Sequence, residues 1–422
     1  MKAKHLIVIF IFISSITNIF SQSDTLLFNQ LLQNLEQNYK LNDNALNADS
    51  VYKLKNKINR TSYLPQLNIV TQASYQSEVT QLPISIPHVT IPTLDKDQYK
   101  IALEANQMIY DGSMTKLKNK RDVLSSELEA VQSKVNLTNL KDMLNKWVYL
   151  YLMNNKIKEQ LEEQKNTLSK KQYEIEQMIN SGIATTTDLD VLKVEILKIE
   201  QQIDALNSAC QSIVSNIELL TAQKINNKKL AYEYENLTPN DTIKRQELTI
   251  YEKRAQLAFI NAELASKSRL PQLFAFGQAG YGKPGLNMLS NEFNTFYLLG
   301  AKMVFNVYDW GKSSKEKKIA QLTKNSIDNE RELFKQNIQI QANEILSSIQ
   351  KVEQWIEKDL QIIDLRNNIL KSTNAKLLNG TAKTTDYLND LNAKTQALID
   401  LERHKIEKQY YIQSYKILTG IK

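Results

Sequence analysis

The sequence is poor in the residues that carry chemistry. It has a single cysteine, Cys210, which excludes an internal disulfide. Its three histidines, His5, His88 and His404, are too scattered to show the spacing of metal ligands. No nucleophile–base pattern accompanies them. We therefore expect a protein that is not an enzyme and that holds no cofactor and no metal.

Proline and glycine are also scarce, with 7 and 10 among 422 residues. Because turns use both residues heavily, this scarcity argues against a loop-rich protein and favours long helices. The chain is 42% hydrophobic, enough to bury a sizeable core. Cys210 falls on an apolar stripe of one such helix, so we expect it to be a small core residue.

Long hydrophobic runs are missing after the first residues. Residues 1–22 have a basic start, an apolar run and a short polar exit, which is the pattern of a secretory signal peptide. No later segment approaches 18 apolar residues, so we expect no transmembrane helix. The single cysteine, Cys210, lies far from the end of the signal, so no lipid anchor is expected there. The exported chain is either soluble or reaches a membrane by another route.

The charge pattern is unremarkable. The formal net charge is +7, and lysines are scattered among glutamates and aspartates. Such a mixture is typical of solvated helix faces rather than of a nucleic-acid-binding surface. We expect no nucleic-acid partner.

Three short landmarks each occur twice, in the same order along the chain. They are LPQL at residues 64–67 and 270–273, YDG and YDWG at 110–112 and 308–311, and the glycine–threonine breaks NSGIATTTD and NGTAKTTD at 180–188 and 379–386. The two LPQL copies are 206 residues apart, and the aspartates of the other two landmarks are each 198 apart. This order predicts two copies of one unit of roughly 200 residues.

Each copy begins with two segments in which apolar residues alternate with small or polar ones. We predict strands at about 66–80 and 99–110 in the first copy, and at about 272–282 and 296–308 in the second. An apolar side opposite a small or polar side is typical of transmembrane barrel strands, although a strand of a soluble sheet has the same period.

Two long helices follow the strands in each copy. The stretch after each Asp-Gly turn has no proline or glycine, and the return segment from Leu189 to Leu220 spaces its apolar residues alternately by three and four. That spacing is a coiled-coil seam. We predict helical hairpins over about 113–222 and 312–418, with an outgoing helix on the order of 100 Å long in each.

These elements divide the chain into four parts. After the signal peptide, residues 23–224 form the first repeat, which has feeder helices ahead of its strands. Residues 225–241 form a polar connector, expected to lie beside the coiled coil. Residues 242–422 form the second repeat, with one feeder helix.

Four strands do not make a stable isolated sheet in lipid, because an open edge leaves unpaired N–H and C=O groups. Strands from other copies of the chain must complete the sheet. Two protomers would give eight strands and an interior filled by side chains, whereas three would give twelve and an open lumen. The geometry favours a trimeric channel with a membrane end and a long soluble end.

The duplicated order of LPQL, strands, Asp-Gly turn, unbroken helix, glycine–threonine break and heptad return resembles the TolC-like outer-membrane efflux proteins over essentially the whole mature chain. The resemblance implies a mainly α protein with membrane β-strands. Three protomers would form a 12-stranded barrel in the bacterial outer membrane, in contact with its lipid, continued by an α-helical coiled-coil barrel in the periplasm.

The same resemblance implies a function and partners. Such a homotrimer is the exit channel of a tripartite efflux or type I secretion system. It receives substrate from a periplasmic adaptor and an inner-membrane pump of the RND or ABC type.

Local chemistry gives the two breaks an explanation of their own. Gly182 and Gly380 suit the left-handed residue that ends a helix. The threonine run would cap the next helix, with Asp188 or Asp386 favoured in its first turn by the helix dipole. The resemblance adds a second role, in which Gly182, Ile183, Gly380 and Thr381 form tips that dock onto the adaptor.

The resemblance also implies a periplasmic gate near these tips. Asp386 matches a position in an acidic ring that lines the aperture, and Asn389 stands where a second acidic ring is usual. Asp188 and Thr187 match positions that tether the neighbouring coiled coil in the closed state. The arginine and tyrosine that usually bind them are replaced here by Ala382 and Leu377, which leaves Lys383 as a substitute cation.

Two other protein classes stay open. A periplasmic adaptor also has a coiled-coil hairpin that ends in a tight turn, but one hairpin flanked by soluble β-domains. A coiled-coil surface adhesin would not need duplicated strand pairs. The sequence does not identify the transported substrate, which is selected at the pump.

Overall fold

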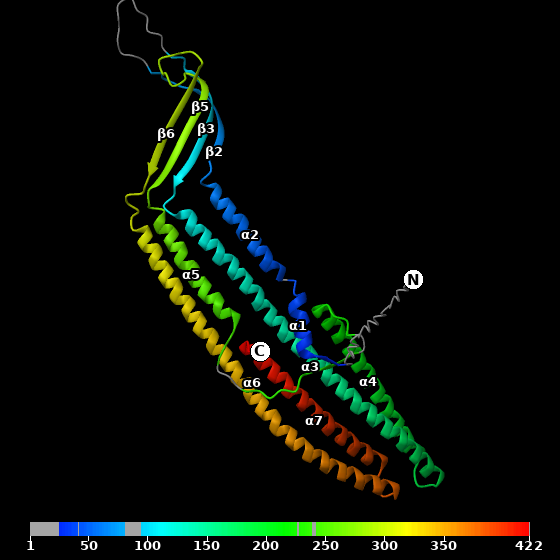
Figure 1. Ribbon diagram of the computed structural model, residues 1–422. Helices are drawn as coiled ribbons and strands as arrows, with labels where there is room; N and C mark the ends of the chain where they lie inside the picture. Colours follow the sequence, from blue (N-terminus) through cyan, green and yellow to red (C-terminus); the bar gives the residue numbers. More distant parts are fainter. Residues whose placement is uncertain (1–24, 41, 81–93, 226–227, 239–241, 422) are drawn as a thin grey trace, which may run out of the picture. The chain divides into compact units, whose positions relative to one another are not determined.

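The computed structural model describes residues 25–40, 42–80, 94–225, 228–238 and 242–421 (Figure 1). Its elements in chain order are β1 (Thr25–Leu27), α1 (Phe28–Asn38), α2 (Asn42–Thr61), β2 (Gln66–Tyr75), β3 (Asp97–Tyr110), α3 (Met114–Asn180), α4 (Thr186–Thr221), β4 (Lys229–Ala231), α5 (Gln246–Lys267), β5 (Gln272–Lys283), β6 (Asn294–Val304), α6 (Lys312–Leu378) and α7 (Thr384–Thr419). Two strands followed by a long helix and a return helix occur twice, which confirms the duplicated, mainly α fold.

Of two predictions that concern export and the membrane, only one falls on the described residues. Within the described residues, none of the helices combines the length and the apolar character that a membrane crossing requires. The signal peptide predicted at residues 1–22 lies outside the described residues.

The chain forms two compact units, each assembled from three segments. One, the strand unit, contains the described residues within 38–143, 236–353 and 411–422; the other, the hairpin unit, contains the described residues within 1–37, 144–235 and 354–410. Each unit draws on both sequence repeats, because α3 and α6 both contribute to the two units.

The strand unit contains one antiparallel sheet in the order β2-β3-β5-β6 (Figure 1). The register within each copy is the same: Gln66 pairs with Asn106 in the first, and Gln272 pairs with Val304 in the second. The β3–β5 pair joins the two copies. The outer edges of β2 and β6 pair with no strand in the part of the chain that the structure describes.

The two faces of this sheet differ in polarity. Since side chains alternate along a strand, the register places one set of apolar residues on a single face. This apolar face includes Leu67, Ile69, Tyr75, Tyr99, Ile101, Leu103, Leu273, Tyr281, Tyr297, Leu299 and Met303. The opposite face carries a hydrogen-bonded row, in which Lys100 Nζ donates to Gln278 Oε1 at 3.2 Å and Gln278 Nε2 donates to Glu104 Oε1 at 2.6 Å.

Two strands are shorter than the sequence predicts. The strand expected over 66–80 ends at Tyr75, and the strand expected over 296–308 ends at Val304. The second difference has a clear cause. β3 continues to Tyr110 because β5 pairs with it there, whereas the equivalent residues 305–308 have no neighbouring strand within the described chain.

The hairpin unit has a core made by the coiled-coil seam. Its buried apolar residues near the glycine–threonine breaks are Leu161, Leu168, Ile175, Leu192, Ile199, Leu377, Tyr387, Leu388 and Leu391. Further along α4, Cys210 is buried on the same stripe, as the sequence predicts. Burial raises the pKa of its thiol, which keeps it protonated and unreactive.

The connector contains a strand that the sequence does not reveal. β4 pairs in parallel with β1, so the start of the described chain is fixed to the connector. Just after β4, the Tyr232 ring packs edge-on against Phe28, with centroids 5.3 Å apart. Its hydroxyl donates to the Asn145 carbonyl at 2.9 Å and lies 2.8 Å from Asn145 Oδ1. Burial raises the pKa of Tyr232, so the hydroxyl stays a donor.

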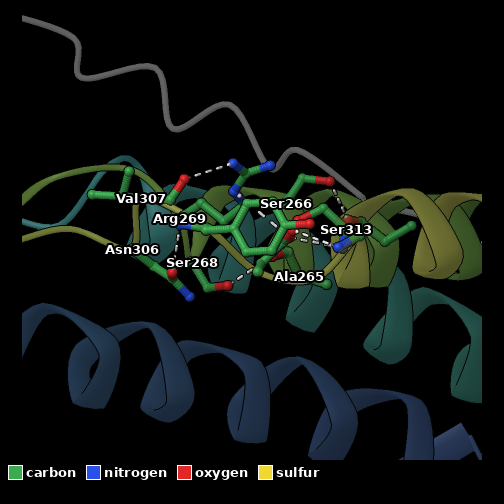
Figure 2. Close-up of polar contacts among 11 residues, drawn as sticks. Ala265, Ser266, Ser268, Arg269, Asn306, Val307 and Ser313 are labelled. Atoms are coloured by element: carbon green, nitrogen blue, oxygen red, sulfur yellow. Dashed lines mark hydrogen bonds and ion pairs between the residues drawn. The ribbon is translucent and has the colours of Figure 1, made fainter.

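Asp309 holds the turn from β6 into α6. Its Oδ2 accepts hydrogen bonds from the backbone amide of Ser313 at 2.9 Å and from the Ser313 hydroxyl at 2.5 Å. Arg269, just after α5, approaches from the side: its Nε lies 3.6 Å from Asp309 Oδ2, and its Nη2 donates to the Val307 carbonyl at 3.5 Å (Figure 2). The Ser313 hydrogen bonds, helped by the charge of Arg269, lower the pKa of Asp309 to about 2.

The first copy builds the same turn with one different partner. The Thr115 amide donates to Asp111 Oδ2 at 2.6 Å, and Tyr63 takes the position that Arg269 has in the second copy. Asp111 is 2% exposed. Burial raises the pKa of Asp111, but hydrogen bonds from Thr115 and Tyr63 outweigh it and leave the pKa below its usual value.

We expect Asp309→Asn to make the free energy of unfolding depend less on pH in the acid range. A carboxyl whose folded pKa is lowered stabilises the fold above its unfolded pKa, and loses that contribution as pH falls from about 4 toward about 2. The variant should be less stable near neutral pH and should lose less stability across that window. Thermal unfolding in detergent, followed by circular dichroism, measures both effects. Asp204→Asn, on an exposed face of α4, is the matched control. An unchanged pH response in Asp309→Asn would contradict this account.

Candidate functional site: the two helical tips

The first tip ends α3 in a Schellman motif. Gly182 has φ 75°, its amide donates to the Ile179 carbonyl at 3.0 Å, and the Ile183 amide donates to the Met178 carbonyl at 2.9 Å. These two bonds satisfy carbonyls that the helix end would otherwise leave unpaired. The glycine therefore ends the helix, as the sequence predicts.

The second tip repeats this geometry at the end of α6. Gly380 has φ 69°, and its amide donates to the Leu377 carbonyl at 2.9 Å. The Thr381 amide donates to the Lys376 carbonyl at 2.9 Å. The four residues predicted as docking tips, Gly182, Ile183, Gly380 and Thr381, are all exposed.

The return helices begin differently in the two copies. Thr185 caps α4 in a capping box: its amide donates to Asp188 Oδ2 at 3.0 Å, and the Asp188 amide donates to Thr185 Oγ1 at 3.4 Å. In the second copy the equivalent residue is Lys383, whose side chain has no acceptor. Asp386 still accepts from the Lys383 amide at 3.0 Å. The predicted threonine cap is therefore correct for α4 and wrong for α7.

Asp188 is held mainly by the cap of its own helix. The Thr185 hydroxyl donates to its Oδ2 at 2.7 Å, and this bond is the main reason why the pKa of Asp188 is lowered. The Thr384 hydroxyl, on a residue 1% exposed, also helps lower that pKa. Among the described residues, the Thr384 hydroxyl has no partner at hydrogen-bond geometry. The two tips also approach each other at Gly380, where an added Cβ would lie 3.4 Å from Ile183 Cγ2.

Four of the five predicted gate residues are exposed. Asp386 and Asn389 are both exposed and, being three residues apart, share one face of α7. Thr187 and Lys383 are also exposed. Leu377, which stands where a tyrosine partner is usual, is buried in the core of the hairpin unit and offers no hydrogen bond to Asp188.

Sequence reasoning missed a polar contact that joins the two hairpins. Lys171 of α3 is 5% exposed, and its Nζ donates to Asn374 Oδ1 of α6 at 2.6 Å and pairs with Glu174. The same ammonium lies 4.8 Å from the centre of the Tyr387 ring of α7. Lys171 falls between Leu168 and Ile175 on the seam. A charged residue at such a core position is the feature of the sequence from which this contact could have been predicted.

A second polar contact joins the hairpins one heptad away from Lys171. Gln164 of α3 donates to Asn392 of α7, and Asn392 Nδ2 donates to Glu195 Oε1 of α4 at 2.9 Å. Both contacts lie among the apolar core residues, where an unpaired polar group is costly. We name Lys171, Asn374, Tyr387, Gln164, Asn392 and Glu195 the clasp.

We expect Gly182→Ala to lower stability by about 1–2 kcal/mol, because a side chain is strained at a left-handed φ. No atom lies within 4 Å of the added Cβ, so the cost is conformational rather than steric. Gly182→Asn is the control, since asparagine tolerates this conformation and should cost less. Chemical denaturation of both variants checks the order. Equal stability of Gly182→Ala and the unchanged protein would contradict the motif.

Solved structures of bacterial outer-membrane channels share this architecture. The outer membrane protein VceC of Vibrio cholerae is 13% identical, with a TM-score of 0.67 over 94% of this chain and 97% of that one. The CmeC outer membrane channel of Campylobacter jejuni is 14% identical, with a TM-score of 0.64 over 93% of this chain and 85% of that one. The open state of the Neisseria gonorrhoeae MtrE outer membrane channel is 13% identical, with a TM-score of 0.65 over 94% and 89%.

No protein-family model matches the chain, and no curated protein matches it. The likeness to solved structures extends over nearly the whole chain at low identity, so it concerns the fold. The chain has the fold of these outer-membrane channels, which confirms the fold expected from its resemblance to the TolC-like proteins.

Proposed function

We propose that three copies of this chain form the exit channel of a tripartite efflux or type I secretion system in the bacterial outer membrane. The observation that carries the proposal is the sheet β2-β3-β5-β6, which has an apolar face and two open edges, joined in one chain to two long helical hairpins. Similar channels of known structure combine the same parts.

The apolar face of the sheet suits contact with lipid. Its apolar side chains are exposed in the single chain, which a protein surface in water seldom tolerates over so wide a patch. Tyr75, Tyr99, Tyr281 and Tyr297 lie toward the loop ends of the four strands. Tyrosine rings concentrate where membrane meets water. On this proposal, one end of the protein lies in the outer membrane and the hairpins extend into the periplasm.

The hairpin tips supply the surface for the partners. The exposed tip residues Gly182, Ile183, Gly380 and Thr381 would dock onto a periplasmic adaptor, which couples to an inner-membrane pump of the RND or ABC type. The competing proposal, that the chain is itself the adaptor, accounts less well for the structure. An adaptor needs one hairpin between soluble β-domains, whereas this chain has two hairpins and a four-stranded sheet.

Reconstitution in planar lipid bilayers tests the proposed channel. Purified protein should form discrete ion-conducting pores and should fractionate with the outer membrane. An adaptor would remain with the inner membrane or the soluble fraction and would conduct nothing.

At the gate, we expect Asp386→Asn to weaken block of the pore by divalent cations. Three Asp386 carboxylates around one axis would concentrate negative potential at the aperture and attract cations there. Asp190→Asn removes another exposed carboxylate near the other tip and serves as control. Single-channel recording at increasing divalent-cation concentration measures the block. If both variants were blocked as strongly as the unchanged pore, Asp386 would not line the aperture.

We propose that the clasp also tethers the two hairpins in the closed state of the channel. Lys171→Ala removes the contacts of α3 with Asn374 and Tyr387, so the hairpins should separate more readily and the pore should open more often. Lys170→Ala is an ideal comparison, because it removes the same charge from the neighbouring, exposed position. Open probability in bilayers measures the difference. Equal open probability for the two variants would rule out Lys171 as part of the tether.

A further inference from the structure

The face of the sheet opposite the apolar face differs between the two repeats. We name it the inner face; it consists of the even-numbered residues of β2, β3 (as far as Met108), β5 and β6. In the first repeat most of its side chains are polar, namely Gln66, Asn68, Gln72, Ser74, Gln98, Lys100, Glu104 and Asn106. In the second repeat it has four large apolar side chains, namely Phe274, Phe276, Phe296 and Leu298.

The pairing of the strands does not require these apolar side chains. β2 pairs with β3 in the same register as β5 pairs with β6, with equivalent residues 206 apart between β2 and β5 and 198 apart between β3 and β6. At the positions of Phe274 and Phe296, the first repeat has Asn68 and Gln98. The same hairpin therefore forms with polar side chains, and the rings need another explanation.

The inner face is the concave side of the sheet. Gly280 lies opposite Ala102 on this face, and an added Cβ would lie 2.9 Å from the Ala102 Cβ, well inside the usual spacing of about 4.5–5.5 Å. Gly277 lies opposite Ala105 on the apolar face, where an added Cβ would have no atom of Ala105 within 4 Å. Neighbouring strands thus converge on the inner face, so on the proposed channel this face lines the lumen.

Glycines on neighbouring strands let two of the rings extend across the inner face. An added Cβ at Gly300 would lie 2.6 Å from Cζ of Phe276, and one at Gly280 would lie 2.7 Å from Cζ of Phe296. Each of these rings therefore covers the glycine that is opposite it in the sheet. With Phe274 they form a partly exposed apolar surface, which we name the aromatic shelf. The interior of a water-filled barrel is ordinarily polar, so such a surface is unusual there.

Positive charge lies at both ends of the aromatic shelf. Lys302 is opposite Phe274, is exposed and forms no ion pair with a described residue. Lys100 Nζ lies 5.4 Å from the centre of the Phe296 ring. Lys302 stands where the first repeat has Glu104, which is the one acidic residue of the strands on this face. Two lysines against one glutamate leave each chain with a net positive charge on the inner face.

We propose that the aromatic shelf and Lys302 form a binding site for organic anions that carry an aromatic ring. The ring lies against the phenylalanines, because aromatic groups attract one another in offset or edge-on contact, and the anionic group meets the Lys302 ammonium. An apolar lining with a few placed polar groups is the usual composition of a small-molecule site. The inference rests on the proposed channel and names a class of solute that the barrel binds during export.

Single-channel recording in planar bilayers tests the class of ligand. Naphthalene-2-sulfonate has both the ring and the charge, methanesulfonate lacks the ring, and 2-naphthalenemethanol lacks the charge. Naphthalene-2-sulfonate should block the pore at a lower concentration than either of the others. Equal or stronger block by methanesulfonate or by 2-naphthalenemethanol would overturn the site.

Variants separate the contact with the ring from the contact with the charge. Lys302→Gln should raise the half-blocking concentration of naphthalene-2-sulfonate about two- to fivefold, the effect of losing an exposed ion pair, whereas Lys302→Arg should not. Phe274→Leu should raise it as well, because the ring opposite Lys302 is lost. Lys55→Gln and Phe305→Leu are the controls, since they remove an exposed charge from α2 and an exposed ring beyond the end of β6. Unchanged block in both Lys302→Gln and Phe274→Leu would contradict the site.

Equilibrium dialysis of the protein in lipid nanodiscs, with empty nanodiscs as reference, measures binding without conduction. If the pore conducts but naphthalene-2-sulfonate binds the unchanged protein no more tightly than Lys302→Gln and Phe274→Leu, the site is wrong while the channel stands. If binding depends on these two residues in a protein that never conducts, the site stands and the proposed channel fails.

Discussion

A peptide group at the edge of a sheet needs a hydrogen-bond partner, and inside a lipid bilayer no water supplies one. This constraint connects the features of the strand unit. Among the described residues, β2-β3-β5-β6 pair with one another, and the outer edges of β2 and β6 pair with no strand. The constraint explains why β6 stops at Val304 although the alternating pattern continues to Tyr308. On the proposed channel, another copy of the chain supplies the missing backbone partners.

The hairpin unit is stabilised by apolar packing along the coiled-coil seam, but its specificity comes from a few buried polar residues. Lys171 and the row Gln164, Asn392 and Glu195 sit at positions where leucine or isoleucine would pack well. Farther along, His404 Nδ1 lies 2.6 Å from Asp359 Oδ2 in a buried contact between α7 and α6. Polar pairs of this kind fix which helices meet and in which register, at some cost in stability.

Much of the fold was predictable from the sequence, because its signals are local and occur twice. The LPQL and Asp-Gly landmarks, the period-2 segments and the heptad of α4 each lie within a short stretch, and the structure has the elements they predict. The failures concern contacts between distant residues. The parallel β1–β4 pair, the clasp and the exchange of Tyr63 for Arg269 beside the turn aspartate depend on partners far away in the chain. The capping error at Lys383 arose because a run of threonines does not show which member occupies the cap.

Duplication has not left the two halves of this chain interchangeable. The turn after β3 has Gly112 where the turn after β6 has Trp310, and both residues have positive φ. Gly112 has no room for a side chain, because an added Cβ would lie 2.8 Å from the Leu270 Cβ, whereas Trp310 is 79% exposed. The same backbone turn therefore makes a close packing contact in one copy and presents an aromatic ring at the surface in the other.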